Sequence, residues 1–272
     1  RLILTEKLTG PSVWAGSDIT GEASWIHELT DGEIASLDNA LSSLRISGKS
    51  FPNFVKEDFQ IPAWTERLRF LSAELEDGRG FYVMRGFPVE RYSAADINNF
   101  YYGIGLNLGT PVRQNPKGEF LGTVMNVGDP NDRETRVYET NAYLPYHTDP
   151  SDVVGLLCLR KAKSGGVSSL VSVASVYNEI LENHPEYLGL FYRTWYYAHL
   201  GEDIPSLSPL FSYNAGKLSF RYLRQYIELG HEVMERPLSR VEREALDLFD
   251  SIAQRDELRL DMILEPGDLQ WA

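Results

Sequence analysis

Apolar residues at helical spacing mark the first third of the chain. Thr30 and Glu33 stand three positions apart, as in a capping box, and apolar residues then recur every three or four positions up to Leu44. A second amphipathic pattern covers residues 64–76, and a third begins after Ser93. We therefore predict three helices in this part of the chain.

Short segments with the composition or alternation of strands follow, separated by turns that contain Gly, Pro or Asn. They cover residues 80–86, 153–159, 167–173, 194–199, 217–222 and 258–264, with a further short strand near Leu121 to Val127. Helices are predicted between them at residues 175–182, at residues 185–193 and after Ser239. Because helices cluster early and many short strands follow without a repeat or a long linker, we predict one α+β domain. It would be a β-sandwich or barrel flanked by N-terminal helices.

An imidazole and a carboxylate stand two positions apart at His147 and Asp149, just before the apolar run of residues 153–159. Side chains of a strand alternate between its faces, so both groups would project from the same face of an extended segment. Chance alone gives about 0.7 His-x-acid pairs (5 × 39/272), and the chain has two. The other pair, His184 and Glu186, lies at the predicted start of a helix and is interpreted as structural.

The spacing of His147 and Asp149 leaves two interpretations open. Two histidines and one carboxylate that leave coordination positions free are typical of non-haem Fe(II) oxygenases, and this pair would supply two of the three ligands. The alternative is a satisfied polar pair at the end of a strand.

Charge and composition narrow the classes of partner. A chain of 272 residues with 43% hydrophobic content can bury a large core, while its net charge of −13 argues against nucleic acid and against an anionic membrane surface. Its single cysteine, Cys158, lies in an apolar run and is expected to be a small core residue. No stretch approaches the roughly 18 apolar residues of a membrane span. We expect a soluble, cytoplasmic protein.

Three motifs, in their linear order, resemble the taurine dioxygenase (TauD/TfdA-like) family. They are His147-Thr-Asp149, Ser164-Gly-Gly-Val-Ser168 and Glu265-Pro-Gly-Asp268, and the similarity runs from about Gly80 to the C-terminus. Members of this family are Fe(II)- and 2-oxoglutarate-dependent oxygenases with a double-stranded β-helix, or jelly roll. The resemblance implies a single catalytic domain over residues 1–272, in which a helical portion (1–79) packs on a jelly-roll core (80–272).

The resemblance also implies roles for individual residues. His147 and Asp149 would be iron ligands at the catalytic centre. Ser168 would hydrogen-bond a carboxylate of 2-oxoglutarate, the alternative being a solvent-facing hydroxyl in a turn. Asn126 would present its amide to the cosubstrate or the substrate, the alternative being a strand-end hydrogen bond. Four further residues could line the substrate side but have no assigned role: Tyr143, Tyr146, Arg221 and Arg224.

Two functions are compatible with this resemblance. In the first, Fe(II), 2-oxoglutarate and O2 hydroxylate or desaturate a small-molecule substrate, with release of succinate and CO2. In the second, a jelly-roll protein with an incomplete metal set binds a small molecule without converting it. Formation of succinate from 2-oxoglutarate distinguishes the two.

The chain departs from the family pattern after the turn at residues 265–268. In the family, a strand with the second iron-binding histidine follows, and then an arginine that pairs with 2-oxoglutarate. This sequence ends at Ala272, before both, and His199 is the least poor substitute for the histidine. Residues 269–272, which follow this turn and are mostly apolar, are also expected to form an unfinished strand with an open edge. We therefore expect the natural chain to continue and the third ligand to lie beyond Ala272.

Overall fold

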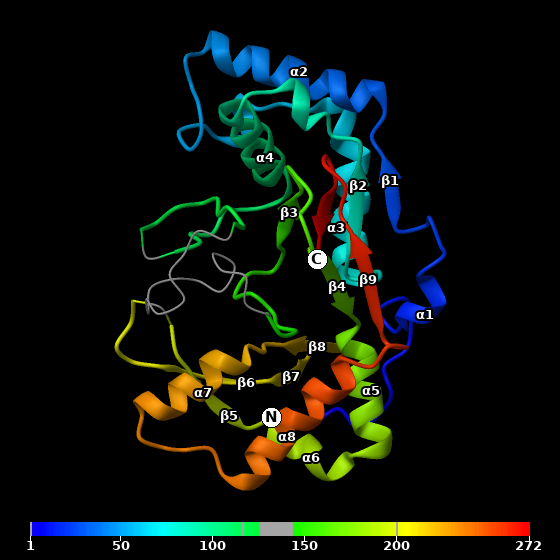
Figure 1. The fold of residues 1–272 in the computed structure, drawn as a ribbon, viewed down its shortest axis with the longest axis vertical. Coiled ribbons are helices and arrows are strands. Elements are labelled where there is room, and N and C mark those ends of the chain that lie inside the picture. Colours follow the sequence, from blue (N-terminus) through cyan, green and yellow to red (C-terminus); the bar gives the residue numbers. More distant parts are fainter. Residues whose placement is uncertain (1, 116, 126–143, 200) are drawn as a thin grey trace. The chain divides into compact units, whose positions relative to one another are not determined.

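The computed structural model of the protein describes residues 2–115, 117–125, 144–199 and 201–272, and Figure 1 shows how their helices and strands are connected. The chain divides into two units. Unit 1 comprises residues 1–20, 122–152 and 170–260, and unit 2 comprises residues 21–121, 153–169 and 261–272. Both mix helices with strands, as predicted for an α+β protein. A single catalytic domain with a division at residue 79 stays a prediction.

Unit 2 contains a four-stranded sheet in the order β1-β2-β10-β3. β1 (Ile26–Glu28) runs parallel to β2 (Tyr82–Arg85), which confirms the strand predicted at residues 80–86. β10 (Leu269–Trp271) is antiparallel to β2 and to β3 (Gly155–Leu157). The sheet therefore joins segments that are far apart in the sequence.

The position of β10 shows that the expected open edge was wrong. Gln270 lies opposite Val83 of β2 on one side and Leu156 of β3 on the other, so β10 is an inner strand. Leu269 and Trp271 are buried, and Figure 1 shows the strand in red between its two neighbours. The pattern of residues 269–272 could not reveal this arrangement, because both partner strands lie more than a hundred residues earlier.

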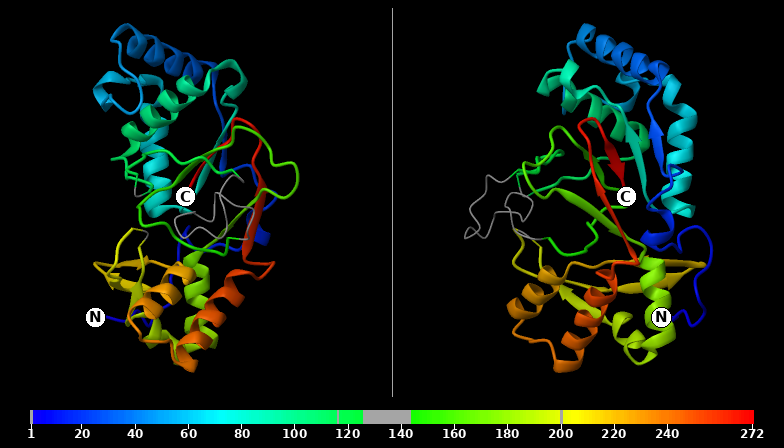
Figure 2. Two further views of the ribbon diagram at one scale, coloured as in Figure 1. Left: turned by 60° about the vertical axis from the view of Figure 1, so that its left-hand side comes forward. Right: turned by 45° about the vertical axis from the view of Figure 1, so that its right-hand side comes forward.

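Three amphipathic helices pack on this sheet and confirm the prediction for the N-terminal third. They are α2 (Asp31–Ile46), α3 (Thr65–Asp77) and α4 (Ala94–Leu108), connected in part by the short 3-10 helices η1 (Lys56–Asp58), η2 (Pro62–Trp64) and η3 (Val89–Arg91). The capping box forms: the Thr30 hydroxyl accepts the Glu33 N–H at 3.2 Å, and the Glu33 carboxylate accepts the Thr30 N–H at 2.8 Å. Figure 2 shows α3 alongside β1 and β2, and the apolar faces of the helices share one core with β2 and β10.

An ion pair with a fully buried carboxylate connects β2 to the turn that precedes β10. Arg85 donates from Nε and Nη2 to the two carboxylate oxygens of Asp268, at 2.9 and 3.0 Å. Asp268 is fully buried and also accepts the Glu265 N–H at 2.9 Å. This hydrogen bonding raises the pKa of Arg85. A planar guanidinium that matches both carboxylate oxygens fixes the turn against the strand.

The same turn requires a glycine at position 267. Gly267 has a φ of +91°, and a Cβ added there would overlap the carbonyl oxygen of Phe87. Its own carbonyl accepts the Phe87 N–H at 3.0 Å, and its N–H donates to the carbonyl of Cys158 at 2.8 Å. The backbone therefore cannot move away to make room without losing two hydrogen bonds.

We expect Gly267→Ala to destabilise the protein by roughly 2 kcal/mol or more, because backbone strain and steric overlap add. Thermal unfolding measures the effect. Gly80→Ala is the matched control: Gly80 has a φ of +84° and nothing within 4 Å of an added Cβ, so it reports strain alone. Equal losses in the two variants would contradict the role of the close approach to Phe87.

Unit 1 is built around aromatic side chains. Its helices are α1 (Gly16–Ile19), α5 (Val173–Asn183), α6 (Pro185–Phe191), α7 (Arg224–Val233) and α8 (Arg240–Ala253). Two antiparallel pairs supply its strands: β5 (Thr194–Tyr197) with β6 (Ser206–Pro209), and β7 (Phe211–Asn214) with β8 (Lys217–Phe220). Tyr177, Phe191, Phe211 and Phe249 are buried in one core. Strands β4 (Val167–Val171) and β9 (Arg259–Ile263) pair with each other and contribute residues to both units.

Most of the later predictions are confirmed, but β6, β7 and α7 had not been predicted, and two predicted strands differ from the structure. The run at residues 153–159 forms only the three-residue strand β3, and Leu156 and Leu159 are 41% and 45% exposed, so the expected buried strand was wrong. Cys158 is accordingly half-buried and not a core residue. The predicted strand near Leu121 to Val127 is absent from its described part, residues 121–125.

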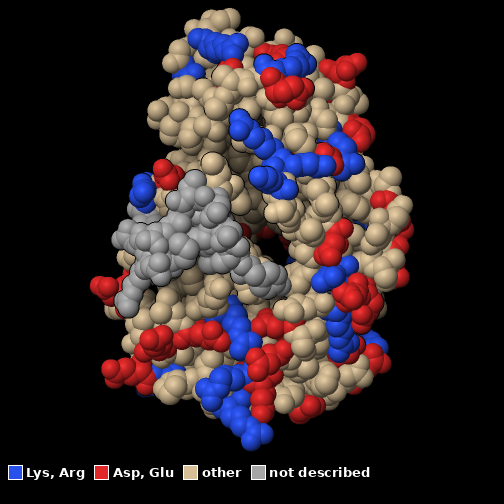
Figure 3. All heavy atoms as spheres, viewed as in Figure 1, with Lys and Arg blue, Asp and Glu red and all other residues tan. Residues whose placement is uncertain are grey.

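Charged side chains of both signs mix on the surface of unit 1. On the face shown in Figure 3, Lys and Arg alternate with Asp and Glu over the region of α7 and α8. Ion pairs such as Arg240 with Glu244, 2.7 Å apart, join them along one helix. Within the described residues, no helix combines the length and the apolar character needed to cross a membrane.

Candidate functional site

His147 and Asp149 lie in unit 1, in a segment outside any helix or strand. The predicted strand position of this pair was therefore wrong. The residue between them holds the segment in place: the Thr148 N–H donates to the Tyr222 carbonyl at 2.8 Å, and the Thr148 hydroxyl accepts the Tyr222 N–H at 2.9 Å. These two hydrogen bonds to Tyr222 fix Thr148, and they do not involve its neighbours His147 and Asp149.

Tyr222 is itself rigidly placed. Its side chain is fully buried, and its hydroxyl donates to Asp250 at 2.6 Å. Asp250 also accepts a hydrogen bond from Arg224 at 2.8 Å. Burial and the Asp250 carboxylate raise the pKa of Tyr222, so the phenol remains a donor. The His147 segment is thus attached to the core of unit 1 through a chain of satisfied polar groups.

The donor set of His147 and Asp149 fits a metal ion. His147 Nδ1 lies 2.8 Å from the carbonyl oxygen of Pro145, which accepts its proton and leaves Nε2 with a free lone pair. This arrangement is the usual one for a metal-binding histidine, because the second ring nitrogen fixes the tautomer and the ring orientation. Asp149 is exposed, and its carboxylate has no hydrogen-bond or ion-pair partner within the described part of the chain. One neutral nitrogen and one carboxylate oxygen suit Fe(II).

Removing the Thr148 hydroxyl tests this support. We expect Thr148→Val to cost about 1–3 kcal/mol, because the N–H of a fully buried residue loses its acceptor. Metal affinity should fall roughly 10- to 100-fold, as is typical when the support of a ligand is lost. Thermal unfolding and titration with Co(II), followed by absorbance, measure the two effects. Thr148→Ser retains the hydroxyl and should behave like the wild type; a Thr148→Val protein with unchanged affinity would argue against the support.

Ser168 lies on β4 in unit 2, in contact with the inner strand of the sheet. Its hydroxyl donates to the side-chain oxygen of Gln270 at 3.0 Å, and the Gln270 amide nitrogen lies 3.1 Å from the sulfur of Met262. Gln270 is only 3% exposed. Ser168 is half-buried and not a solvent-facing turn residue. Its contact with 2-oxoglutarate stays a prediction.

The remaining site predictions have different outcomes. Asn126 and Tyr143 lie outside the described residues. Tyr146 packs against the core of unit 1. His199, considered as a substitute ligand, lies 2.7 Å from the Ser206 hydroxyl. The part of the chain that the structure describes contains no cluster of three His, Cys, Asp or Glu side chains suited to a metal ion.

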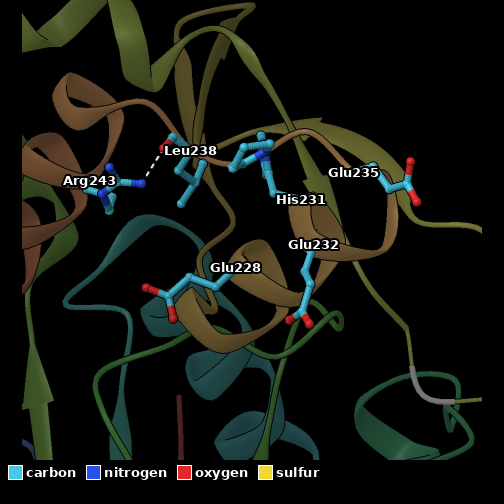
Figure 4. A pocket seen from close by; sticks show the side chains of 7 residues that line it. Glu228, His231, Glu232, Glu235, Leu238 and Arg243 are labelled. Atoms are coloured by element: carbon cyan, nitrogen blue, oxygen red, sulfur yellow. Dashed lines mark hydrogen bonds between the residues drawn. The ribbon is translucent and has the colours of Figure 1, made fainter.

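A cavity of about 540 Å3 lies at the end of α7 in unit 1. Its lining includes Glu228, Glu232 and Glu235, whose carboxylates point away from one another (Figure 4). His231, also in the lining, has both ring nitrogens in use: Nδ1 lies 2.8 Å from the carbonyl of Arg236, and Nε2 accepts the Tyr196 N–H at 3.3 Å. The arrangement does not resemble a metal or catalytic site.

Sequence reasoning missed the residues that support the site. Tyr222 ends a predicted strand and Asp250 lies within a predicted helix, and neither position differs in the sequence from an ordinary core or surface residue. Gln270 stands in the motif region but had no signal of its own. A polar residue between two buried apolar ones, at Leu269 and Trp271, is the pattern that would have indicated it.

Comparison with known proteins places the chain among oxygenases. Residues 47–272 match the model of the family described as "Taurine catabolism dioxygenase TauD, TfdA family". FR-33289 synthase of Streptomyces rubellomurinus is 33% identical over 276 residues, covering 98% of this chain and 81% of that protein. The taurine hydroxylase-like protein SAT17 of Stachybotrys chartarum is 26% identical, covering 98% of this chain and 72% of that protein.

Solved structures share the fold. An asparagine oxygenase in complex with Fe(II), 3-hydroxyasparagine and succinate has a TM-score of 0.67 at 18% identity, covering 91% of this chain and 84% of its own. The non-haem iron oxygenase OrfP with Fe and α-ketoglutaric acid has a TM-score of 0.60 at 17% identity, covering 90% of this chain and 84% of its own. From the family match and the level of identity together, we conclude that the chain belongs to the TauD/TfdA family of Fe(II)- and 2-oxoglutarate-dependent dioxygenases.

Proposed function

We propose that the protein hydroxylates or desaturates a small molecule at carbon, with His147 and Asp149 as two of the ligands of its iron. The observation that carries this proposal is the hydrogen bond from His147 Nδ1–H to the Pro145 carbonyl, which leaves Nε2 free as a ligand. The rigid attachment of Thr148 to Tyr222 supports it, because both ligands flank a fixed residue. We further propose a jelly-roll core, as in the family.

The other roles follow from the same proposal. Bound iron, with 2-oxoglutarate and O2, supplies the oxidising chemistry, and the protein binds, orients and shields the reactants. Ser168 is proposed to hydrogen-bond a carboxylate of 2-oxoglutarate and Asn126 to contact the cosubstrate or the substrate. Ser168 is suited to this role because its oxygen retains acceptor capacity and its hydroxyl can turn from Gln270 toward a stronger, anionic acceptor.

The class of substrate is proposed from the relatives. FR-33289 synthase and the taurine hydroxylase-like protein are named for reactions on small molecules. Solved neighbours hold hydroxyasparagine or L-arginine. A small polar metabolite is therefore the proposed substrate, and neither nucleic acid nor a membrane is a proposed partner.

Succinate formation tests the proposed function. The purified protein is incubated with Fe(II), ascorbate, 2-oxoglutarate and a mixture of small polar metabolites, and succinate is measured by mass spectrometry. We expect succinate to require both the protein and Fe(II), and one metabolite to gain an oxygen or lose two hydrogens. A protein that binds 2-oxoglutarate with Fe(II) and makes no succinate with any mixture would contradict the proposal.

A further inference from the structure

Two arginines that stand three positions apart have different surroundings in unit 1. The guanidinium of Arg224 contacts three carboxylates, of Glu228, Asp247 and Asp250, at 2.7–2.8 Å. The guanidinium of Arg221 has no carboxylate partner and no side-chain hydrogen bond among the described residues. It lies over the ring of Tyr197 instead, 4.6 Å from the ring centroid. Arg224 is therefore held by ion pairs within the fold, whereas no carboxylate of the described residues occupies the donors of Arg221.

The backbone of Arg221 is fixed on both sides. Its N–H donates to the Leu210 carbonyl at 2.9 Å, and its carbonyl accepts the Tyr197 hydroxyl at 2.6 Å. Burial raises the pKa of Tyr197, so this hydroxyl stays protonated and keeps donating. The Tyr197 ring also supports the guanidinium through a cation–π contact. A half-buried arginine held in this way loses little conformational freedom when it binds a partner.

Alternation along the chain places Arg221 on the side away from the core. Phe220 and Tyr222 stack on each other with ring centroids 5.9 Å apart, and both belong to the aromatic core. Because neighbouring side chains of an extended segment point to opposite sides, the side chain between them points outward. This direction agrees with the partly exposed surroundings of Arg221.

The same logic applies to the segment bound to Tyr222. Tyr146 packs on the core and Thr148 bonds to Tyr222, so His147 and Asp149 are the residues that remain directed away from it. Arg221 is the chain neighbour of Tyr222, and His147 and Asp149 are the chain neighbours of Thr148. Among the described residues Arg221 has no carboxylate partner, and we infer from the Thr148–Tyr222 hydrogen bonds that it lies next to the segment that carries His147 and Asp149.

We propose that Arg221 binds an oxyanionic group of the substrate: a carboxylate, a sulfonate or a phosphonate. The proposal rests on the proposed function, because it places this group beside His147 and Asp149. A guanidinium presents paired N–H donors that match two oxygens of such a group, and it is more weakly hydrated than an ammonium ion. The bound anion would fix the substrate with its reacting carbon on the iron side, so that Arg221 selects anionic over neutral substrates.

Direct binding of small anions tests this proposal without turnover. Propylphosphonate, propanesulfonate, butyrate and neutral butyramide are titrated into the wild type and into Arg221→Met, Arg221→Lys and Arg240→Met, with binding followed by NMR. Arg240 is the matched control, since its side chain is 86% exposed and it is the first residue of α8. We expect at least one of the three anions to bind the wild type and the control alike, and to bind Arg221→Met about 10- to 100-fold more weakly.

Two further results are expected. Arg221→Lys should recover only part of the affinity, because a point charge replaces the paired donors. Affinity for 2-oxoglutarate, titrated with Mn(II), should stay within about twofold in Arg221→Met, as should the unfolding midpoint. Unchanged anion affinity in Arg221→Met, binding of butyramide as tight as that of the anions, or a selective loss of 2-oxoglutarate affinity would each overturn the assignment. Absence of succinate in every variant, with Arg221-dependent anion binding, would instead contradict the proposed function alone.

Discussion

The His147→Ala variant is expected to lose Fe(II) affinity and 2-oxoglutarate-dependent succinate formation by more than about 100-fold. Loss of a residue that only supports a ligand typically costs 10- to 100-fold, and loss of the ligand itself should cost more. His147 is half-buried and does not belong to either core cluster, so the fold should be little affected. Metal titration and a succinate assay measure the two losses, and thermal unfolding checks the fold.

The chain contains its own control for this experiment. His184 also stands two positions before an acidic residue, but it lies at the junction of α5 and α6, and its N–H donates to the Ile180 carbonyl at 2.8 Å. His184→Ala should retain Fe(II) affinity and activity. If both variants were equally active, or equally inactive while folded, His147 would not be an iron ligand.

A second large effect is expected at the ion pair between β2 and the turn before β10. We expect Arg85→Met to destabilise the protein by about 3–5 kcal/mol, because it leaves the fully buried Asp268 carboxylate without its charged partner. At about 2–4 °C for each kcal/mol, the unfolding midpoint should fall by roughly 10 °C or more. Thermal unfolding followed by circular dichroism measures the shift.

The double variant Arg85→Met with Asp268→Leu separates the two contributions. It removes both charges, so it should recover part of the stability that the single variant loses. Arg69→Ala is the surface control, because the Arg69–Glu66 pair is more than two-thirds exposed and should contribute little. A double variant less stable than Arg85→Met would show that Asp268 is stabilised mainly by the Glu265 N–H and not by the guanidinium.

Helices α2 and α8 could be predicted from the sequence because their signals are local, whereas α7 was missed. Thr30 with Glu33 and Ser239 with Glu242 form capping boxes, and each box lies within four residues of the chain. The turn before the predicted strand at residues 217–222 could also be recognised, because it contains Asn214 and Gly216; in the structure Ala215 and Gly216 adopt positive φ angles there. Signals of this kind do not depend on the rest of the fold.

The sheet of unit 2 could not be predicted, because its pairings are not local. β10 has three residues and its two partners come from residues 82–85 and 155–157. No periodicity in residues 269–272 distinguishes an inner strand from an unfinished edge. The prediction of a jelly-roll core therefore rested on the family resemblance, and this core remains part of the proposal.

The candidate metal ligands could be predicted from the sequence, but the residues that hold them in place could not. The spacing and sequence context of His147 and Asp149 identified them as candidate ligands. Their predicted position in a strand was wrong, because Thr148 is held by hydrogen bonds to Tyr222 and not by the repeated backbone hydrogen bonds of a β-sheet. Arg221 and Arg224 had equivalent sequence signals. Only the positions of Asp247 and Asp250 on α8 show which of the two arginines is neutralised.

The inner position of β10 has a consequence for the order of events during synthesis. β1 and β2 are made early, yet β3 joins their sheet only through a strand about 185 residues after β2. Until residues 269–271 have been synthesised, the edge of β2 that pairs with β10 stays open. The four-stranded sheet can therefore form only after this late segment has been made, and the earlier strands and helices of unit 2 are the segments that a chaperone would protect in the meantime.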